Sequence, residues 1–506
     1  MLVIIEILCG LIIFLLYYYF TATFNFWKKR NIPGPQPALF FGTMKNIILG
    51  RTILAKYLKS IYDAYEDAPF VGIFNMREPI LLIKDPEHIK NVLIKDSALF
   101  SSRGLPVYSK AEPWNNFLFF ADGPMAHVIR TRMSTIFTPS KIKEIYHTML
   151  ESLERLDIYL EESLPRNDHM INCSELGARL TADIIGNNLM GINMTTLTTE
   201  NFEKNDFIRY SNMTRGTNWS IIVKVIMQKT FPRLYNQIGY YFFNHEEVNN
   251  FYVNFLLEIM EYRKKHGIIK PDVVGLLMEI KENPGKLSEI TGSDVSNEFL
   301  ASYIFGFFYA GYETAASTIC NTLYELAFHP NIQDKLRKEI LDTYAKNNGQ
   351  LLYDHINTMP YLNAVFKETL RKYPPADSVQ REVSTSYTFK NTDINVPKKQ
   401  KVIISIHALH HDSKLYPNPD IYDPDRFIDE MSHPRDPMHY LPFGHGPRNC
   451  IGERLGILQS KVGLIGILRN YKIDVCEKTV TSYGYVSHRF VTAPSTDIFI
   501  KMTKAN

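Results

Sequence analysis

The first hydrophobic segment of the chain is an apolar run over residues 2–20 that contains one charge, Glu6. A run of 19 residues is long enough to cross the hydrocarbon core of a bilayer as a helix. Lys28, Lys29 and Arg30 follow, and such a basic flank stays on the cytoplasmic side of a membrane. The pattern predicts an N-terminal anchor, with the remaining chain in the cytosol and the N-terminus across the membrane.

A cleaved signal peptide is the alternative for this segment. The apolar core of a signal peptide is usually shorter, and its positive charge precedes that core. In this chain the charge follows the apolar run, so we expect the anchor to be retained.

The rest of the chain shows mainly helical periodicity with some strand patterns. Segments of helical length and spacing are residues 140–162, 247–265, 297–328 and 331–347. Turn signals and alternating apolar positions typical of strands occur at residues 70–83 and 387–406. A few short strands among many helices predict a mainly α fold with a small segregated β-sheet region.

Prolines mark the boundary between the anchor and the folded part. Pro33, Pro35 and Pro37 restrict the backbone to a stiff, extended spacer. No repeat and no second linker follows. We expect an anchor at residues 1–22, a basic and Pro-rich hinge at residues 23–50, and one folded unit at residues 51–506.

Charge and cysteine content exclude several classes of function. The 56 Lys and Arg against 53 Asp and Glu give a formal net charge of +3, which is too small to indicate nucleic-acid binding. The five cysteines are far apart and form no C-x-x-C pair or Cys/His cluster with zinc-finger spacing. We expect a reducing compartment, no structural zinc and no nucleic-acid partner.

One cysteine lies in an unusual loop, PFGHGPRNCIG, at residues 442–452. Taken alone, Cys450 is consistent with a buried core thiol, a nucleophile, a zinc ligand, half of a disulfide or an axial haem ligand. The three glycines let a bulky group approach the backbone, and Arg448 favours the thiolate over the thiol. The loop therefore indicates a thiolate beside a bound ligand and leaves the ligand open.

The longest expected helix contains FGFFYAGYETAAST at residues 305–318. Ala310 and Thr314 share a face on which small side chains leave room for a ligand. The Thr314 hydroxyl is expected to bond to a carbonyl in the preceding turn. A buried packing helix is the alternative, and Glu313 weighs against it because a carboxylate in apolar surroundings needs a partner.

A second helix, at residues 360–375, carries Glu368 and Arg371 three residues apart, so that they can pair. An E-x-x-R alone is a weak signal, because such pairs occur on the solvated faces of many helices. The order of motifs is more specific: A-G-x-x-T, E-x-x-R, PDRF at residues 424–427, then F-G-x-G-x-R-x-C-x-G. In this order the chain resembles a cytochrome P-450, a haem-thiolate monooxygenase, over essentially its whole length.

In finer detail the chain is similar to microsomal enzymes of insects that oxidise foreign compounds. The resemblance implies the cytochrome P-450 fold and a haem b whose iron is bound by Cys450, the one metal ligand. It assigns further residues to binding of this cofactor, with the first two pairing with the propionates: Arg448, Arg381, Arg130, Phe443 and Gly444.

The segment around Arg130 departs from the family pattern. The family usually has a tryptophan four residues before this arginine, where the present chain has Ala126. His127 is a second candidate for a propionate contact. The resemblance also implies that Glu368, Arg371 and Arg426 form an ion-pair network that serves folding and haem retention.

On the oxygen side of the haem, the resemblance assigns catalytic roles to Thr314 and Glu313, which would help to deliver protons. An apolar aromatic lining favours lipophilic substrates. The residues that match substrate contacts of the family are Tyr108, Trp114, Phe117, Phe307, Val379 and Phe490.

The implied reaction inserts one atom of O2 into a lipophilic small molecule, either a xenobiotic or an endogenous lipid or hormone. The chain has no nucleotide-binding turn in a strand–turn–helix context. Electrons would therefore come from a separate protein. The resemblance implies that this protein is NADPH-cytochrome reductase, which takes electrons from NADPH, with cytochrome b5 as a second donor, at the endoplasmic reticulum membrane. Candidates for a basic docking face are Lys335, Arg337, Lys338, Arg454 and Lys461.

Three other functions were weighed. A haem-thiolate isomerase or dehydratase acting on peroxides shares the fold, but Thr314 in its A-G-x-x-T setting argues against it. A non-catalytic haem or lipid binder would not consume NADPH in the presence of reductase. A hydrolase with a cysteine nucleophile would remain active without haem.

Overall fold

The computed structural model describes residues 2–214, 218–243, 245–291, 295–428, 435–487 and 489–505. The chain separates into two compact units, each built from segments that are distant in sequence. Unit 1 consists of Met1–Leu105, Asp377–Pro419 and Asp436–Asn449, and unit 2 of Pro106–Ala376, Asp420–Arg435 and Cys450–Asn506. The expected division into anchor, hinge and one folded unit stays a prediction.

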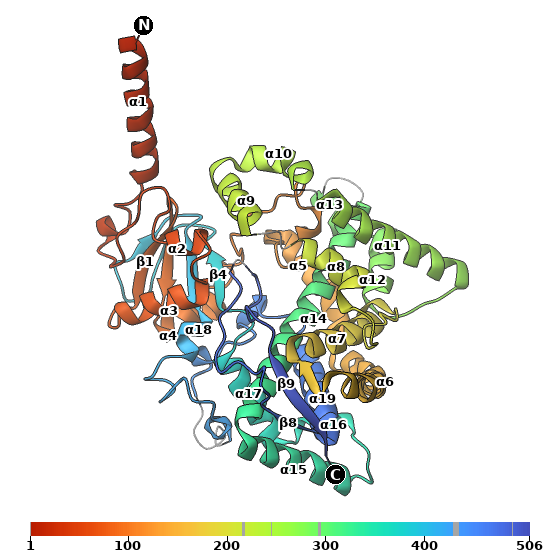
Figure 1. The fold of residues 1–506 in the computed structure, drawn as a ribbon. Helices are drawn as coiled ribbons and strands as arrows, with labels where there is room; N and C mark the ends of the chain where they lie inside the picture. The colour runs from red at the N-terminus through yellow and green to blue at the C-terminus, as the bar shows by residue number, and fades with distance from the viewer. Residues whose placement is uncertain are drawn as a thin grey trace. The chain divides into compact units, whose positions relative to one another are not determined.

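The apolar segment at the N-terminus forms helix α1 (Leu2–Thr21), which has no buried residue (Figure 1). Of the described residues, only α1 forms a helix long and apolar enough to cross a membrane, with a mean hydropathy of 2.4. The last turn of α1 joins unit 1, because the rings of Phe20 and Phe40 lie 4.7 Å apart and the Arg77 guanidinium lies 3.7 Å from the Tyr19 ring. The helix is consistent with the predicted membrane anchor.

Unit 1 is built around a four-stranded sheet with the order β1–β2–β7–β4. Strands β1 (Phe70–Asn75) and β2 (Glu78–Ile83) form an antiparallel hairpin, and β7 (Lys401–Ser405) pairs parallel to β2 and antiparallel to β4 (Ser378–Glu382). The remaining elements of unit 1 are α2 (Lys45–Ile48), α3 (Leu54–Ala64), α4 (Pro86–Lys90), β5 (Tyr387–Thr388), β6 (Asn395–Val396) and α18 (Ile406–His410).

Unit 2 is predominantly helical. Its described residues form a three-stranded sheet with the order β3–β9–β8, from Met170–Asn172, Phe499–Lys504 and Tyr471–Asp474. Its N-terminal helices are α5 (Gly123–Met133), α6 (Pro139–Ser163), α7 (Cys173–Ile185), α8 (Asp206–Met213), α9 (Asn218–Thr230), α10 (Pro232–Phe242), α11 (Glu246–His266), α12 (Val273–Glu282) and α13 (Lys286–Thr291). Its C-terminal helices are α14 (Asn297–Phe328), α15 (Pro330–Lys346), α16 (Tyr353–Asn357), α17 (Pro360–Lys372) and α19 (Glu453–Asn470).

Helix α14 forms the centre of unit 2 and runs through the surrounding helices (Figure 1). The Ser296 side chain caps its start by accepting a hydrogen bond from the Phe299 amide, and Pro330 at the start of α15 follows its end. Most residues of α14 are buried in the main apolar core, against α7, α11 and α19. The helix is therefore held rigidly on several sides.

The predicted mainly α fold with small sheets is confirmed, as are the four long helices. The segment at residues 70–83 is a hairpin, turning at Met76, whose φ of +55° is left-handed. The segment at residues 387–406 has the predicted strands separated by turns. It contains the short β5–β6 pair and β7, and α18 begins at its last residue, Ile406.

Candidate functional site

One stripe along the buried helix α14 is left uncovered by protein. Phe307 and Thr314 are half-buried and Ala310 between them is exposed, whereas most neighbouring positions are buried. These residues recur every three to four positions and so lie on one face of the helix. The structure therefore confirms that Ala310 and Thr314 share a face, and it adds that this face is open.

Three successive carbonyl groups of α14 accept hydrogen bonds from side chains at this point. The Thr314 hydroxyl donates to the Ala310 carbonyl at 2.8 Å, as predicted. Gln459 of α19 donates to the Gly311 carbonyl at 2.7 Å, and Thr181 of α7 donates to the Tyr312 carbonyl at 2.9 Å. Two of these donors come from α7 and α19, so these helices hold α14 in place at this point. Side-chain donors at helix carbonyls also allow a helix to bend locally.

Glu313 lies beside this stripe but is itself buried, with 7% of its surface exposed. One carboxylate oxygen is 3.7 Å from a guanidinium nitrogen of Arg489, whose side chain is 28% exposed. The partner that a buried carboxylate needs is thus supplied by the C-terminal part of unit 2. The ion pair thus connects the buried Glu313 carboxylate, next to Thr314 in sequence, with the Arg489 side chain, which is in contact with water.

Cys450 has an exposed thiol, whereas Cys173 and Cys320 are buried. Cys450 lies three residues before the first residue of α19, and a helix N-terminus favours a nearby negative charge. Partial burial lowers the pKa of the Arg130 guanidinium, and the neighbouring Cys450 sulfur offsets part of this effect. A cation and a helix start thus both favour the thiolate form of Cys450.

The loop before Cys450 belongs to unit 1, and two of its glycines have left-handed backbone angles. Gly444 has a φ of +68° and Gly446 a φ of +76°. At Gly446 a Cβ atom would lie 1.8 Å from the Leu93 carbonyl oxygen, so no other residue fits. Gly452, which the sequence grouped with them, has a φ of −93° and needs no such freedom.

Three arginines are linked in unit 1, and the sequence analysis missed one of them. A guanidinium nitrogen of Arg103 donates to the Arg448 carbonyl at 3.3 Å, and the Arg103 carbonyl accepts from Gln380 at 2.9 Å. Arg381, the next residue of β4, donates to the Gln380 carbonyl at 2.9 Å and is buried. These contacts connect three arginines through backbone carbonyl groups, and arginine side chains suit an anionic ligand. Arg103 has no local sequence signal, because these contacts form only when β4 and the 100–105 segment meet.

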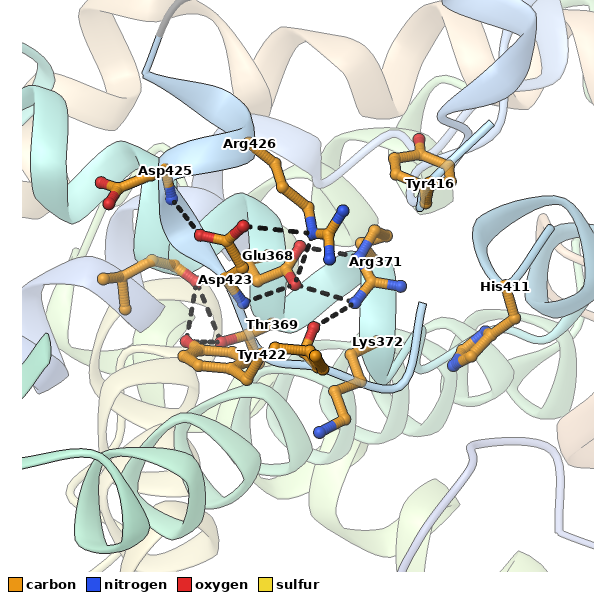
Figure 2. A network of polar contacts seen from close by, with 12 residues as sticks. Glu368, Thr369, Arg371, Lys372, His411, Tyr416, Tyr422, Asp423, Asp425 and Arg426 are labelled. Atoms are coloured by element: carbon orange, nitrogen blue, oxygen red, sulfur yellow. Dashed lines mark hydrogen bonds and ion pairs between the residues drawn. The ribbon is translucent and has the colours of Figure 1, made fainter. Parts of the chain in front are cut away.

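The Glu368–Arg371 pair lies in the core of unit 2, not on a solvated helix face (Figure 2). Both side chains have 0% exposure, and Glu368 also accepts from the Asp423 amide at 2.9 Å. Arg426 approaches the Glu368 carboxylate at 3.6 Å. Burial raises the pKa of the Glu368 carboxyl, and the hydrogen bonds and charge of Arg371 offset part of this. The expected network of Glu368, Arg371 and Arg426 is therefore present.

Aromatic rings cluster on α14 next to the open stripe. The ring centroids of Phe117 and Trp114 lie 6.2 and 6.4 Å from that of Phe305 of α14. The ring centroids of Phe119 and Phe490 lie 4.7 Å apart. Tyr108 does not join them, because it packs 4.9 Å from Tyr235 of α10. Trp114 and Phe117 thus pack against α14 and Phe490 packs against Phe119, whereas the structure places Tyr108 in a separate small cluster. Their contact with substrate stays a prediction.

The expected basic docking face is only partly exposed. Arg337 is buried and donates to the Leu468 carbonyl at 2.9 Å, and Lys461 is buried with a hydrogen bond to Asn363. These two residues were wrongly placed on the surface, because they lie on the sides of α15 and α19 that pack inward. Lys338 and Arg454 are exposed. Lys335 is exposed and pairs with Asp425 at 2.8 Å.

The donor set of this chain fits a haem. Unit 2 contains an exposed cysteine near a helix start and an open helix face with small side chains, and unit 1 contains three arginines that are connected through backbone carbonyl groups. A haem needs these three kinds of group: a thiolate for iron, a flat apolar surface for the ring and cations for the propionates.

Ala126 is buried with Ile129 on the inner face of α5, whereas His127 is exposed.

Comparison with known proteins agrees with the geometry. The family model described as Cytochrome P450 matches residues 32–500. The chain is 33% identical to Cytochrome P450 6B1 of Papilio polyxenes, over 100% of this chain and 99% of that protein. It is 33% identical to Probable cytochrome P450 6a13 of Drosophila melanogaster, with 96% of each covered, and 33% identical to Cytochrome P450 6A1 of Musca domestica, with 93% and 92% covered.

Proposed function

We propose, since this chain belongs to the cytochrome P450 family of haem-thiolate monooxygenases, that Cys450 is the cysteine whose thiolate binds the haem iron. The observation that carries this proposal is the exposure of the Cys450 thiol at the start of α19, beside Arg130. Three of the other cysteines fit the role less well, because Cys173 and Cys320 are enclosed in the core and Cys9 lies in α1.

The cations of the chain would hold the haem carboxylates. Arg448 and Arg381 were assigned to the propionates from the sequence. We add Arg103, which donates to the Arg448 carbonyl and accepts, at its own carbonyl, from Gln380 next to Arg381. Arg130 would act nearer to the sulfur, where its charge favours the thiolate. Phe443 and Gly444 would carry the loop along the ring, with the left-handed turn at Gly444 setting its course.

The haem, when bound, supplies the activation of O2. Thr314 would hold a proton at its hydroxyl oxygen, which already donates to the Ala310 carbonyl and stands on the open face of α14. Glu313 would pass protons to this hydroxyl from the water-exposed side, where its carboxylate meets Arg489. The two residues thus have separate tasks, one of holding a proton and one of supplying it.

The substrate class follows from the lining of the stripe. Phe117 is half-buried and Phe490 is exposed, and such uncharged aromatic rings favour lipophilic molecules. The curated relatives named above are insect cytochromes P450 of family 6. We infer that foreign lipophilic compounds, with endogenous lipids or hormones as the alternative, are the substrates.

Electrons would reach the haem from a redox partner, which we propose to be NADPH-cytochrome reductase, with cytochrome b5 as a second donor. We further propose that α1 anchors the protein in the endoplasmic reticulum membrane, with the basic residues after it on the cytosolic side. The exposed Lys338 and Arg454 are candidates for partner docking.

Two measurements test the proposal. The reduced, carbon monoxide-bound protein is expected to show the red-shifted Soret band of thiolate ligation, and Cys450→Ser is expected to abolish this band while Cys476→Ser retains it. With NADPH and reductase, a panel of lipophilic compounds is expected to yield products that carry one oxygen atom from O2. A band that survives Cys450→Ser, or NADPH consumption that is absent with every compound, would reject the assignment.

A further inference from the structure

Glu112 lies in the segment that carries the aromatic lining, and its carboxylate is buried at 4% exposure. One oxygen accepts hydrogen bonds from Tyr235 of α10 at 2.5 Å and from Gln228 of α9 at 3.2 Å, and it pairs with the Lys224 ammonium. The other oxygen accepts from Asn115 at 2.7 Å. We call Glu112 and these four residues the Glu112 cluster.

The Glu112 cluster joins two parts of unit 2 that are far apart in sequence, residues 112–115 and the consecutive helices α9 and α10. Two further hydrogen bonds join the same parts of the chain. The Tyr108 hydroxyl donates to the Gln228 carbonyl of α9 at 3.0 Å, and the Lys110 amide donates to the Asn236 side chain of α10 at 3.1 Å. Tyr108, Ala111 and Tyr235 form a small apolar cluster that is separate from the main core of unit 2. Helices α9 and α10 are therefore tied to the 108–115 segment mainly by polar groups.

The same segment positions the aromatic lining of the site. Two residues after Glu112, Trp114 packs edge-on against His245, with ring centroids 4.6 Å apart, and His245 lies 2.7 Å from the Ala111 carbonyl. Three residues further on, the Phe117 ring lies so close to Gly306 of α14 that a Cβ atom there would be 2.4 Å from it. A displacement of Glu112 must therefore move Trp114 and Phe117 relative to α14.

The charges of the cluster make this tie strong. Burial raises the pKa of the Glu112 carboxyl, but the Lys224 charge and the hydrogen bonds from Lys224 and Tyr235 outweigh burial, so the pKa is lowered overall. A buried carboxylate that loses its cation is strongly destabilised. Lys224 is 21% exposed, so its ammonium group would reach water if the ion pair with Glu112 broke.

We propose that Glu112 is a positioning residue for substrate selection, which ties α9 and α10 to the 108–117 segment and thereby limits how far Trp114 and Phe117 can withdraw from α14. This inference rests on the proposed monooxygenase function. An intact cluster keeps the lining close and disfavours bulky molecules. A loosened cluster admits bulky molecules faster and leaves small molecules unaffected.

The test uses the full-length protein with haem and two imidazole probes of different size, 4-phenylimidazole and clotrimazole. Both bind through an imidazole nitrogen, so size is the main difference, and association is followed by the absorbance change in stopped flow. Lys224→Met and Tyr235→Phe are expected to raise the association rate constant for clotrimazole about tenfold and about threefold, and that for 4-phenylimidazole less than about twofold. Tyr235→Phe removes one hydroxyl and retains the ring, so it serves if Lys224→Met folds poorly.

Two comparisons separate positioning from general loosening. The double variant Glu112→Gln/Lys224→Met removes both charges, and the side-chain oxygen of the introduced glutamine can still accept from Tyr235 and Gln228. No buried charge is left unpaired, so the clotrimazole association rate is expected to return toward the wild-type value. Asp272→Asn alters another buried ion pair of unit 2, Arg263–Asp272 with 2.7 Å contacts, and is expected to change neither rate.

The outcomes are distinct. Equal changes for both probes, or equal effects of Asp272→Asn and Lys224→Met, would overturn the inference. An absence of any imidazole spectrum or carbon monoxide band in the wild-type protein would instead overturn the proposed function.

Discussion

The Glu368 carboxylate accepts two hydrogen bonds from the Arg371 guanidinium, at 2.7 and 2.8 Å, and neither side chain is exposed to water. Arg371 also donates to the Ile421 carbonyl at 3.3 Å, and the Asp423 amide donates to Glu368. The pair thus fixes the 421–426 segment on α17 (Figure 2). It is a fold-determining contact that also holds Arg426 in place.

Arg371→Met is expected to destabilise the protein by roughly 3–5 kcal/mol, because it leaves the buried Glu368 carboxylate without its cation. Thermal unfolding and the carbon monoxide band per mole of protein measure the effect. The matched control is Lys335→Met, which breaks the exposed Lys335–Asp425 pair and is expected to cost less than about 1 kcal/mol. Similar losses of stability in both variants would show that the buried Glu368–Arg371 pair contributes no more to stability than an exposed ion pair does.

Thr314→Ala is expected to retain the haem and the carbon monoxide spectrum but to direct more NADPH into hydrogen peroxide and less into product. The reason is that the variant loses the hydroxyl on the open face of α14 that we propose to hold the proton. The measurement is the ratio of product to NADPH oxidised, with peroxide assayed in the same reaction. Thr314→Ser is expected to be milder because it retains the hydroxyl.

Thr318→Ala is the control for Thr314→Ala. The Thr318 hydroxyl makes the same kind of bond one turn later, to the Thr314 carbonyl at 3.0 Å, but Thr318 is buried at 3% exposure. It is expected to leave the product ratio unchanged. A ratio that falls equally in both variants would assign the effect to the shape of the helix and not to the proton.

Lys461 predicts a specific pH dependence of stability. Burial, with a contribution from Lys367, lowers the pKa of Lys461 from 10.5 to about 8. The unfolded chain therefore binds this proton more tightly, and the contribution of Lys461 to stability rises as pH increases from about 8 to 10.5. Lys461→Met is expected to raise the free energy of unfolding at pH 7 by about 2 kcal/mol and to remove this rise.

Denaturant unfolding at pH 7, 8.5 and 10 measures the Lys461 effect. Lys338→Met, which changes an exposed lysine of α15, is expected to leave the pH profile as in the wild-type protein. A wild-type profile that persists in Lys461→Met would mean that Lys461 is charged in the folded protein at pH 8 to 10.

Partner docking is expected to be electrostatic. Salt screens surface charges over about 8 Å at physiological ionic strength, so turnover supported by reductase is expected to fall with added salt and with Lys338→Glu or Arg454→Glu. Turnover driven by peroxide bypasses the partner and is expected to change little. Lys265→Glu, an exposed position in the last turn of α11, makes the same charge change as a control. Equal loss with and without the partner would assign these residues to the fold.

The sequence predicted the long helices well, because their apolar spacing and end signals are local. The predicted bounds of α14 agree with the structure, since Ser296 caps its start and a proline follows its end. Burial of charged residues was less predictable. Lys461 was placed on the surface by its charge, although it lies in helical phase with the buried Leu458 and Ile465, a signal that could have revealed it.

Local sequence patterns did not predict contacts between residues that are distant in sequence. Glu112 and Lys224 are separated by more than one hundred positions, and nothing near either residue marks it as a partner of the other. Arg103 joins Arg448 only through the fold of unit 1. The motif around Cys450 was recognisable because the chemistry of that loop is concentrated in eleven consecutive residues.

The hydrogen bond from Gln459 to the Gly311 carbonyl limits which changes of length the chain can tolerate. Gln459 follows Cys450 by nine residues, most of them in α19, and its amide must point at α14 from a fixed rotation about the α19 axis. One inserted or deleted residue between them would turn Gln459 by about 100° and shift it by about 1.5 Å. Substitutions within this stretch can leave the Gly311 contact in place, whereas an insertion or deletion of even one codon cannot.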